Sequence, residues 1–184
     1  MQSSSSKSNS GFTIVELLFA LAVAAILFGF AGNAASAAIN AARTNNGLAS
    51  LVAALTRARS IAAAEGIEVV LCPSSDGGTC SAEDHWESGW IAFQAIHGTG
   101  EREADEPILL RQPALPAQVH LVTTTGRTRI RFQPSGGNLG SNATFTFCDG
   151  RGARAASAYA LSNAGNLHAS QTQPENVDEA CAGL

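Results

Sequence analysis

The chain has 184 residues, which suffices for one domain of about 100–150 residues and an additional long helix. Only 14% of the residues are charged, and the formal net charge is -4 at pH 7. This balance excludes a strongly basic surface, so bulk electrostatics does not predict nonspecific binding of nucleic acid.

The first predicted element is an apolar helix over residues 12–31 that contains one carboxylate, Glu16. About 20 residues of helix extend about 30 Å, which matches the hydrocarbon thickness of a bilayer. A carboxylate at bilayer depth costs on the order of 2.5 kcal/mol or more, so Glu16 needs a partner or a function. A cleavable secretory signal is the alternative, with Lys7 as its charge and Ala35-Ser36-Ala37 as its cleavage site. Glu16 argues against it, since a secretory signal has no use for a charge within its apolar run.

The same helix is predicted to continue to Ala64. The sequence after Ala31 is rich in alanine, contains no proline before Gly66, and Gly66 is suited to end the helix. Apolar residues recur at mostly three- and four-residue spacings, which predicts one stripe that packs on the rest of the protein. The stripe consists of Ile39, Leu48, Leu51, Val52, Leu55, Ala58 and Ala62.

All four cysteines follow the apolar segment, a position that predicts an oxidising compartment beyond a membrane and two disulfides. Four cysteines allow three pairings. The short spacing between Cys72 and Cys80 favours a local loop, which leaves Cys148 to pair with Cys181. The alternative is four reduced thiols in a cytosolic protein.

After Gly66 the pattern changes to short runs typical of strands, separated by turn residues. It predicts an antiparallel sheet that packs on the apolar stripe of the helix, an α+β fold. Of the two tryptophans, Trp90 is expected in the core and Trp86 at the rim. The tail, residues 170–184, is expected to be mobile except at Cys181. The expected strands cover residues 67–72, 90–94, 108–111, 119–123, 128–133, 144–148, 159–162 and 166–169.

The stretch from Gly11 to Leu18, GFTIVELL, closely resembles the class III signal of type IV prepilins and type II secretion pseudopilins. The resemblance implies that a prepilin peptidase cleaves between Gly11 and Phe12 and methylates the new amino group of Phe12. Glu16 is then the fifth residue of the mature chain. Its carboxylate can meet the amino group of Phe12 in a neighbouring subunit, within an apolar bundle of helices where an unpaired charge is costly.

The remainder of the chain resembles minor pilins and pseudopilins with a GspH or FimT/FimU type domain. The resemblance rests on the loop from Cys72 to Cys80, on Gly89-Trp90-Ile91, and on the CDGRG turn at residues 148–152. It implies a fold of the type IV pilin kind, with a leader at residues 1–11, a helix at residues 12–65 and a β-rich head at residues 66–184. Within the helix, residues 12–31 are expected in the membrane or the filament core and residues 32–65 on the head.

Nucleic-acid binding is considered at two places. Some FimT proteins bind DNA through a Gly-Arg-x-Arg segment, but the corresponding residues 165–168 here are GNLH, without arginine. In the segment GRTRIRF, a strand would project three arginines from one face, where they could contact phosphates. A solvated outer face of the sheet is the alternative. The candidate residues are Arg127, Arg129 and Arg131, with Arg151 and Arg154 as a possible extension.

The sequence does not indicate an enzyme, a cofactor or a metal site. It contains no Gly-x-Ser-x-Gly, P-loop or His-Glu-x-x-His motif. The histidines at positions 85, 97, 120 and 168 are scattered without ligand spacing. An acidic loop lacks the spacing of an EF-hand, which favours a hydrated surface turn. Its carboxylates belong to Glu101, Glu103, Asp105 and Glu106.

These observations favour a structural subunit, a minor type IV pilin of the FimT/FimU kind that acts near the pilus tip or in initiation. The resemblance implies a single pass through the bacterial inner membrane with a periplasmic head, followed by assembly with major and minor pilins. Its function would support pilus biogenesis, twitching motility or DNA uptake. The first alternative is a type II secretion pseudopilin, since the leader is common to both systems. The second is a DNA-binding minor pilin for natural transformation.

Overall fold

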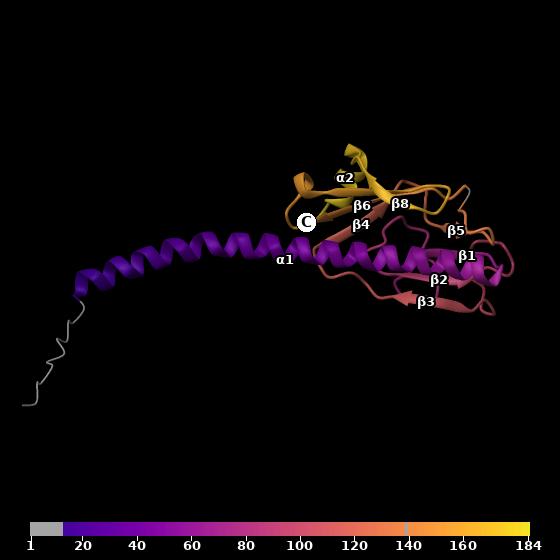
Figure 1. The fold of residues 1–184 in the computed structure, drawn as a ribbon, viewed down its shortest axis with the longest axis horizontal. Helices are drawn as coiled ribbons and strands as arrows, with labels where there is room; N and C mark the ends of the chain where they lie inside the picture. The colour runs from indigo at the N-terminus through magenta and orange to yellow at the C-terminus, as the bar shows by residue number, and fades with distance from the viewer. Residues whose placement is uncertain (1–12, 139) are drawn as a thin grey trace, which may run out of the picture. The chain divides into compact units, whose positions relative to one another are not determined.

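The computed structural model describes residues 13–138 and 140–184, with the side chains of residues 28 and 30–33 excepted. Its first element is helix α1, Ile14–Glu65 (Figure 1). The chain divides after Ala38 into two units. The predicted cleavage site, Gly11 and Phe12, lies outside the described residues, as does the rest of the leader.

In the first unit, the helix exposes large apolar side chains on all sides. Nine of them, between Ile14 and Leu27, are 49–79% exposed. Glu16 lies in the first turn, where its backbone N–H donates to Thr13 Oγ1 at 3.3 Å. Among the described residues, none of the helices has an apolar stretch long enough to cross a bilayer. Part of the predicted span, residues 12–31, lies outside the described residues.

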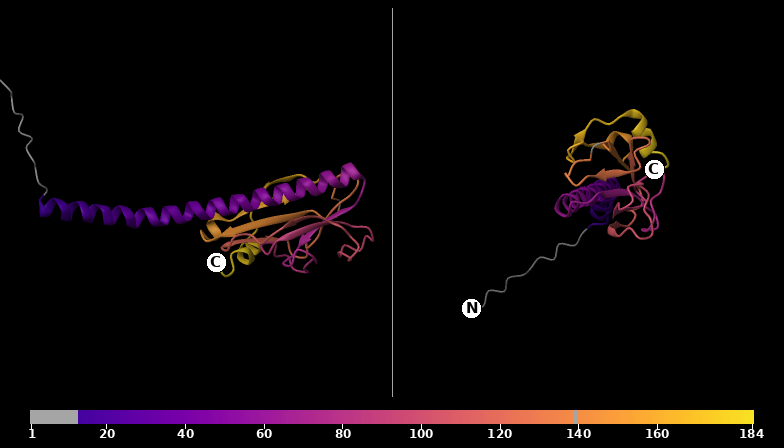
Figure 2. Two further views of the ribbon diagram at one scale, coloured as in Figure 1. Left: turned by 90° about the horizontal axis from the view of Figure 1, so that it is seen from below. Right: turned by 90° about the vertical axis from the view of Figure 1, so that its right-hand side faces the viewer.

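The second unit combines α1 from Ile39 onward with two four-stranded antiparallel sheets, and it confirms the α+β fold class. One sheet has the order β3-β2-β1-β5 and the other β4-β6-β7-β8. Figures 1 and 2 show both sheets lying along this part of α1. The strands are β1 Val69–Pro73, β2 Trp90–Gln94, β3 Ile108–Gln112, β4 Val119–Thr123, β5 Ile130–Phe132, β6 Ala143–Asp149, β7 Ser157–Leu161 and β8 Leu167–Ser170.

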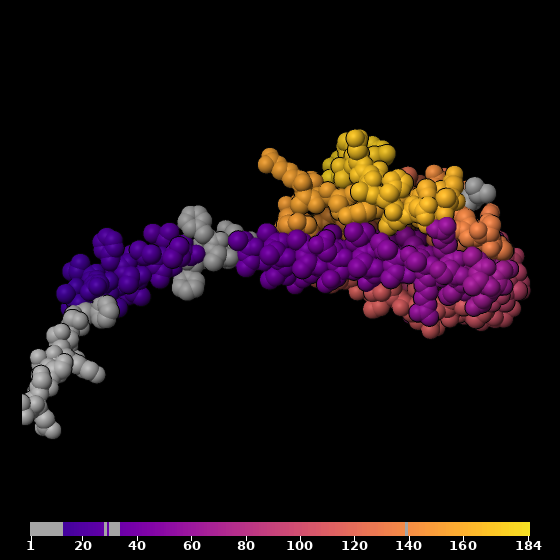
Figure 3. Space-filling model, in the orientation of Figure 1, coloured from indigo at the N-terminus to yellow at the C-terminus, as the bar shows by residue number. Residues whose placement is uncertain are grey.

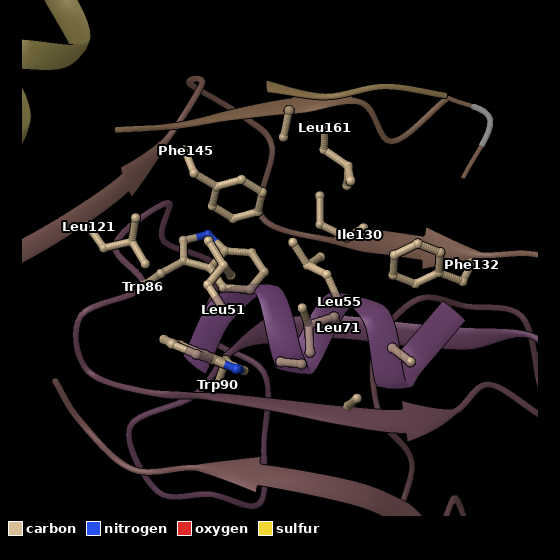
Figure 4. Packing of buried hydrophobic residues seen from close by; sticks show 14 of the residues in the cluster. Leu51, Leu55, Leu71, Trp86, Trp90, Leu121, Ile130, Phe132, Phe145 and Leu161 are labelled. Atoms are coloured by element: carbon tan, nitrogen blue, oxygen red, sulfur yellow. The ribbon is translucent and has the colours of Figure 1, made fainter. Parts of the chain in front are cut away.

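The core lies between α1 and the inner faces of the two sheets (Figure 4). Helix residues Leu51, Leu55, Ala58 and Ala62 are buried at spacings of three and four, as the apolar stripe predicts. The expectation for Trp86 was wrong, because Trp86 and Trp90 are both fully buried. Burial of Trp86 is compatible with its polar nitrogen, since Nε1 donates to Thr123 Oγ1 at 3.2 Å.

Two glycines mark the ends of elements that the sequence predicted. Gly66 follows α1 with φ +67°, the left-handed conformation that ends many helices. Gly89 precedes β2 with φ +108°, and a Cβ there would lie 2.6 Å from the carbonyl oxygen of Gln112. A side chain at position 89 would collide with this oxygen, so only glycine fits here. This explains the Gly-Trp pair at the start of β2.

The C-terminal segment is ordered by a second helix, so the expectation of a mobile tail was wrong. A 3-10 turn, η1 Ala153–Ala155, precedes β7, and helix α2 spans Pro174–Ala180. Val177 and Ala180 are buried, and Ala180 packs with Val122 and Cys148. The disulfides are Cys72–Cys80 and Cys148–Cys181, the pairing that the spacing favours. The second disulfide attaches the end of α2 to β6.

Candidate functional site

The CDGRG turn is organised around the buried carboxylate of Asp149, at the end of β6. Arg151 donates to it through Nε and Nη2, with the shortest contact at 2.7 Å, and also through its backbone N–H. The hydroxyl of Thr44, on α1, donates to Asp149 Oδ2. These donors therefore connect the helix to the turn through one carboxylate.

The same contacts determine the protonation of Asp149. The Arg151 guanidinium, together with the Thr44 hydroxyl, lowers the pKa of Asp149 to about 2 against the opposing effect of burial. Asp149 in turn raises the pKa of Arg151. The pair is therefore charged throughout the physiological range. Arg151, one of the predicted phosphate contacts, is engaged within the protein.

The predicted arginine row does not form one face of a strand, because β5 begins only at Ile130. Arg129 is the most enclosed, with its side chain 14% exposed. It donates to the carbonyl oxygens of Gly100 and Ser81 and to Glu101 Oε1, the last at 2.6 Å. Its guanidinium thus holds two loops together.

The other two arginines of the row also contact the protein. Arg131 pairs with Glu68 at 3.1 Å and donates to the carbonyl oxygen of Gly98. Arg127 donates to the carbonyl oxygen of Gly140 at 2.8 Å and is otherwise exposed. Arg154, in η1, is exposed as well. The five predicted phosphate contacts are therefore not assembled into one free basic surface within the described residues.

The acidic loop between β2 and β3 is more ordered than the sequence indicates. Glu106 is only 1% exposed, and it accepts the backbone N–H groups of Ile96, His97 and Glu103. Burial raises the pKa of Glu106, but these donors outweigh burial and leave it below its usual value. The expectation of a wholly hydrated turn was therefore wrong for Glu106. Glu101, Glu103 and Asp105 are exposed, as expected.

The hairpin that contains residues 165–168 lies beside α1. Arg59, on the helix, donates to Asn166 Oδ1 at 2.9 Å. Arg59 also lies close to Gly165, where an added Cβ would be 3.1 Å from its Cδ. A guanidinium is therefore present near this hairpin, although the hairpin itself contributes none.

One group of side chains was missed entirely by the sequence analysis. Asp84, His85 and Glu179 bring an imidazole and two carboxylates together, with ligand atoms within 4.8 Å of one another. The ligand atoms of a second group, His97, Glu103 and Asp105, also lie within 4.8 Å of one another, and this group is exposed. Asp84 and Glu179 are 95 positions apart in the sequence, so no local spacing could have indicated the first group.

Comparisons with known proteins define the class and then the family. The model of the prokaryotic N-terminal methylation motif matches residues 6–32, and this motif with the α+β head defines a pilin-like protein. The model of type II transport protein GspH matches residues 48–165, more than half of the chain. The chain belongs to this family, which joins minor type IV pilins and pseudopilins.

Two crystal forms of one solved minor pilin support the fold. The minor pilin FimU of Pseudomonas aeruginosa is 16% identical with a TM-score of 0.56, covering 70% of this chain and 88% of that one. In a second crystal form of FimU the TM-score is 0.51, with 16% identity and coverage of 66% and 88%. The minor pseudopilin EpsH of Vibrio cholerae gives a TM-score of 0.48 at 13% identity, covering 70% and 96%. No curated protein matches the chain.

Proposed function

We propose that the chain is a minor type IV pilin of the FimT/FimU kind, a structural subunit that acts near the tip of a pilus or in its initiation. A prepilin peptidase cleaves between Gly11 and Phe12 and methylates Phe12. The helix then holds the subunit in the inner membrane, with the head in the periplasm, until it is incorporated into the filament.

The observation that carries this proposal is the methylation motif at the start of a helix that is apolar on all sides. A helix of this composition is not stable facing water, so it requires lipid or other apolar helices around it. A filament of packed helices supplies that environment after the subunit leaves the membrane. Glu16 is the exception in this helix, and the methylated amino group of a neighbouring Phe12 is its partner.

The head offers a further contact surface on the outer side of α1. In the view of Figure 3, no other part of the chain covers this side of the helix. A shallow groove there is lined mainly by small and apolar side chains, and Val52 is 40% exposed. This surface supports lateral packing on other pilin subunits. The groove residues are Asn45, Leu48, Ala49, Val52, Ala53, Thr56 and Arg57.

The experiment is mass spectrometry of filaments sheared from the cell surface. The proposal expects a mature chain that begins with methylated Phe12 in the surface fraction. Recovery of that chain only in periplasmic filaments would favour the type II secretion alternative. A native chain that starts at Met1, or one that is cleaved near Ala37, would contradict both assignments.

Binding of DNA stays a prediction. The internal contacts of Arg129, Arg131 and Arg151 leave fewer free donors for phosphate than the sequence suggested. We therefore base the proposed function on assembly.

A further inference from the structure

The strongest unassigned feature of the head is the group formed by Asp84, His85 and Glu179. Asp84 and His85 belong to the connection between β1 and β2, whereas Glu179 lies in α2. The carboxylate oxygens and an imidazole nitrogen all lie within 4.8 Å of one another. Nitrogen and oxygen donors at such separations can converge on one divalent cation after small side-chain rotations.

Both segments are fixed by contacts outside the group. The backbone on either side of His85 pairs with β4: Trp86 N–H donates to the Leu121 carbonyl at 2.7 Å, and Thr123 N–H donates to the Asp84 carbonyl at 3.0 Å. The end of α2 is held by the disulfide at Cys181. The donor positions are therefore imposed by the fold rather than by attraction among the three side chains.

The orientation of His85 points to a cation. Nδ1 of His85 lies 3.0 Å from Glu87 Oε1, and Glu87 Oε2 accepts the backbone N–H of Leu121 at 3.2 Å. A carboxylate on one imidazole nitrogen is the usual arrangement around a metal-bound histidine, because it places the proton on that nitrogen. Nε2 then presents its lone pair toward Glu179 Oε1, 3.8 Å away.

This arrangement leaves three acceptors facing one another. Within residues 13–138 and 140–184, neither the Asp84 carboxylate nor the Glu179 carboxylate accepts a hydrogen bond. With Nδ1 protonated, Nε2 is an acceptor too. Two carboxylates and an imidazole lone pair at this distance repel one another, and a divalent cation removes the repulsion by binding all three.

We propose that Asp84, His85 and Glu179 bind a zinc ion that ties α2 to the connection between β1 and β2. One imidazole and two carboxylates are ligands that zinc accepts, with water in a fourth position. The imidazole disfavours calcium and magnesium, and zinc binds such sites more tightly than manganese does. The ion links these two segments in addition to the disulfide, and its existence does not depend on the proposed function.

The second group, His97, Glu103 and Asp105, differs in its exposure and in the contacts of its imidazole. All three side chains belong to one exposed loop. His97 Nε2 is already 2.9 Å from Asp105 Oδ2, and this hydrogen bond raises the pKa of His97. The Nε2 nitrogen of His97 is therefore already engaged by a carboxylate of its own loop. This group therefore serves as a matched control of the same composition.

The test is calorimetric titration of zinc chloride into the full chain in detergent, with its disulfides formed and bound metal removed by EDTA. We expect one zinc ion per chain. Asp84→Asn and Glu179→Gln should each weaken binding at least tenfold, and Glu87→Gln about 10- to 100-fold through the orientation of His85. Glu103→Gln should leave the affinity unchanged. Zinc X-ray absorption should show one imidazole among oxygen ligands.

Two outcomes would overturn the proposal. If the wild-type chain binds no zinc at millimolar concentration, the three side chains do not form a metal site. If Glu179→Gln binds zinc as tightly as the wild type, or if Glu103→Gln removes binding, the ion binds elsewhere. Unchanged circular dichroism in each variant shows that the affinities compare folded proteins.

Discussion

Asp149 shows how one residue can account for a whole sequence motif. Its carboxylate accepts hydrogen bonds from Arg151 and from Thr44, so the CDGRG turn and α1 share one acceptor. A buried carboxylate without these donors is costly, because it loses its hydration without replacement. The arginine of the motif therefore has a structural explanation that needs no external ligand.

The lowered pKa of Asp149 predicts a specific dependence of stability on pH. The ionised carboxylate stabilises the native state fully above the ordinary aspartate pKa of 3.8, and this contribution is lost as the pH falls through the native pKa of about 2. The difference between the two values corresponds to roughly 2 kcal/mol. Urea unfolding from pH 6 to pH 2 should show Asp149→Asn less stable than the wild type by that amount at pH 6, with the two curves converging in acid.

A matched control is Glu83→Gln, which changes an exposed carboxylate in the same head. Its unfolding curve should run parallel to that of the wild type over the whole range. If Asp149→Asn also remained parallel to the wild type, the carboxylate would contribute nothing that depends on its charge.

At the scale of elements, α2 depends on contacts made far away in the sequence. Its seven residues are too few for a stable isolated helix. It persists because Val177 and Ala180 are buried and because Cys181 is bonded to Cys148. The helix should therefore separate from the head when that bond is removed.

The two disulfides predict different losses of stability. The Cys148–Cys181 bond closes a sequence separation of 33, and the Cys72–Cys80 bond one of 8. The chain-entropy model gives about 3.7 kcal/mol for the longer loop and about 2.5 kcal/mol for the shorter. Replacing both cysteines of a pair by serine should reduce the free energy of unfolding in that order.

Hydrogen exchange distinguishes the two variants further. Removal of Cys148–Cys181 should accelerate exchange in residues 174–180, while removal of Cys72–Cys80 should leave those residues protected. Equal exchange in both variants would mean that packing alone holds α2.

The elements also show where sequence patterns sufficed. Strands β2 and β4 have the predicted bounds, because turn residues flank each apolar run. Strand β5 is shorter than predicted, because its ladder with β1 pairs only Ile130–Phe132, opposite Val69–Leu71. Helix α2 was missed because its stability comes from tertiary contacts.

The candidate sites also differ in whether the sequence alone could predict them. The methylation motif is local, so a short stretch of sequence was enough to indicate it. The group of Asp84, His85 and Glu179 exists only once α2 packs beside the connection between β1 and β2. The partners of the arginines were also not predictable, because backbone carbonyls carry no sequence signal.

At the scale of the whole molecule, the head can fold on its own contacts, whereas the first part of α1 needs contacts with other molecules. The head has its own buried core and two disulfides. The first part of α1 has exposed apolar side chains and one carboxylate. Only contacts with other molecules can bury these apolar side chains and pair the carboxylate. A change at Glu16 should therefore affect assembly without affecting the head.

This separation gives a prediction for Glu16→Ala. The variant should fold and be cleaved at Gly11, but it should enter filaments at least tenfold less often than the wild type. In the proposed pairing, loss of Glu16 leaves the methylated amino group of a neighbouring subunit buried without a counter-charge. This costs several kcal/mol, and each 1.4 kcal/mol is a factor of ten. Quantitative blotting of sheared filaments against total cell protein measures the ratio.

The matched control is Glu65→Ala, which removes an exposed carboxylate at the other end of the same helix. The same side chain is removed in both variants, so a loss of incorporation confined to Glu16→Ala assigns the effect to position 16 rather than to the loss of any carboxylate from the helix. Glu16→Gln keeps the size of the side chain and should behave like Glu16→Ala if the pairing is electrostatic. Normal filament levels for Glu16→Gln would mean that a hydrogen bond, rather than a charge pair, is what this position contributes.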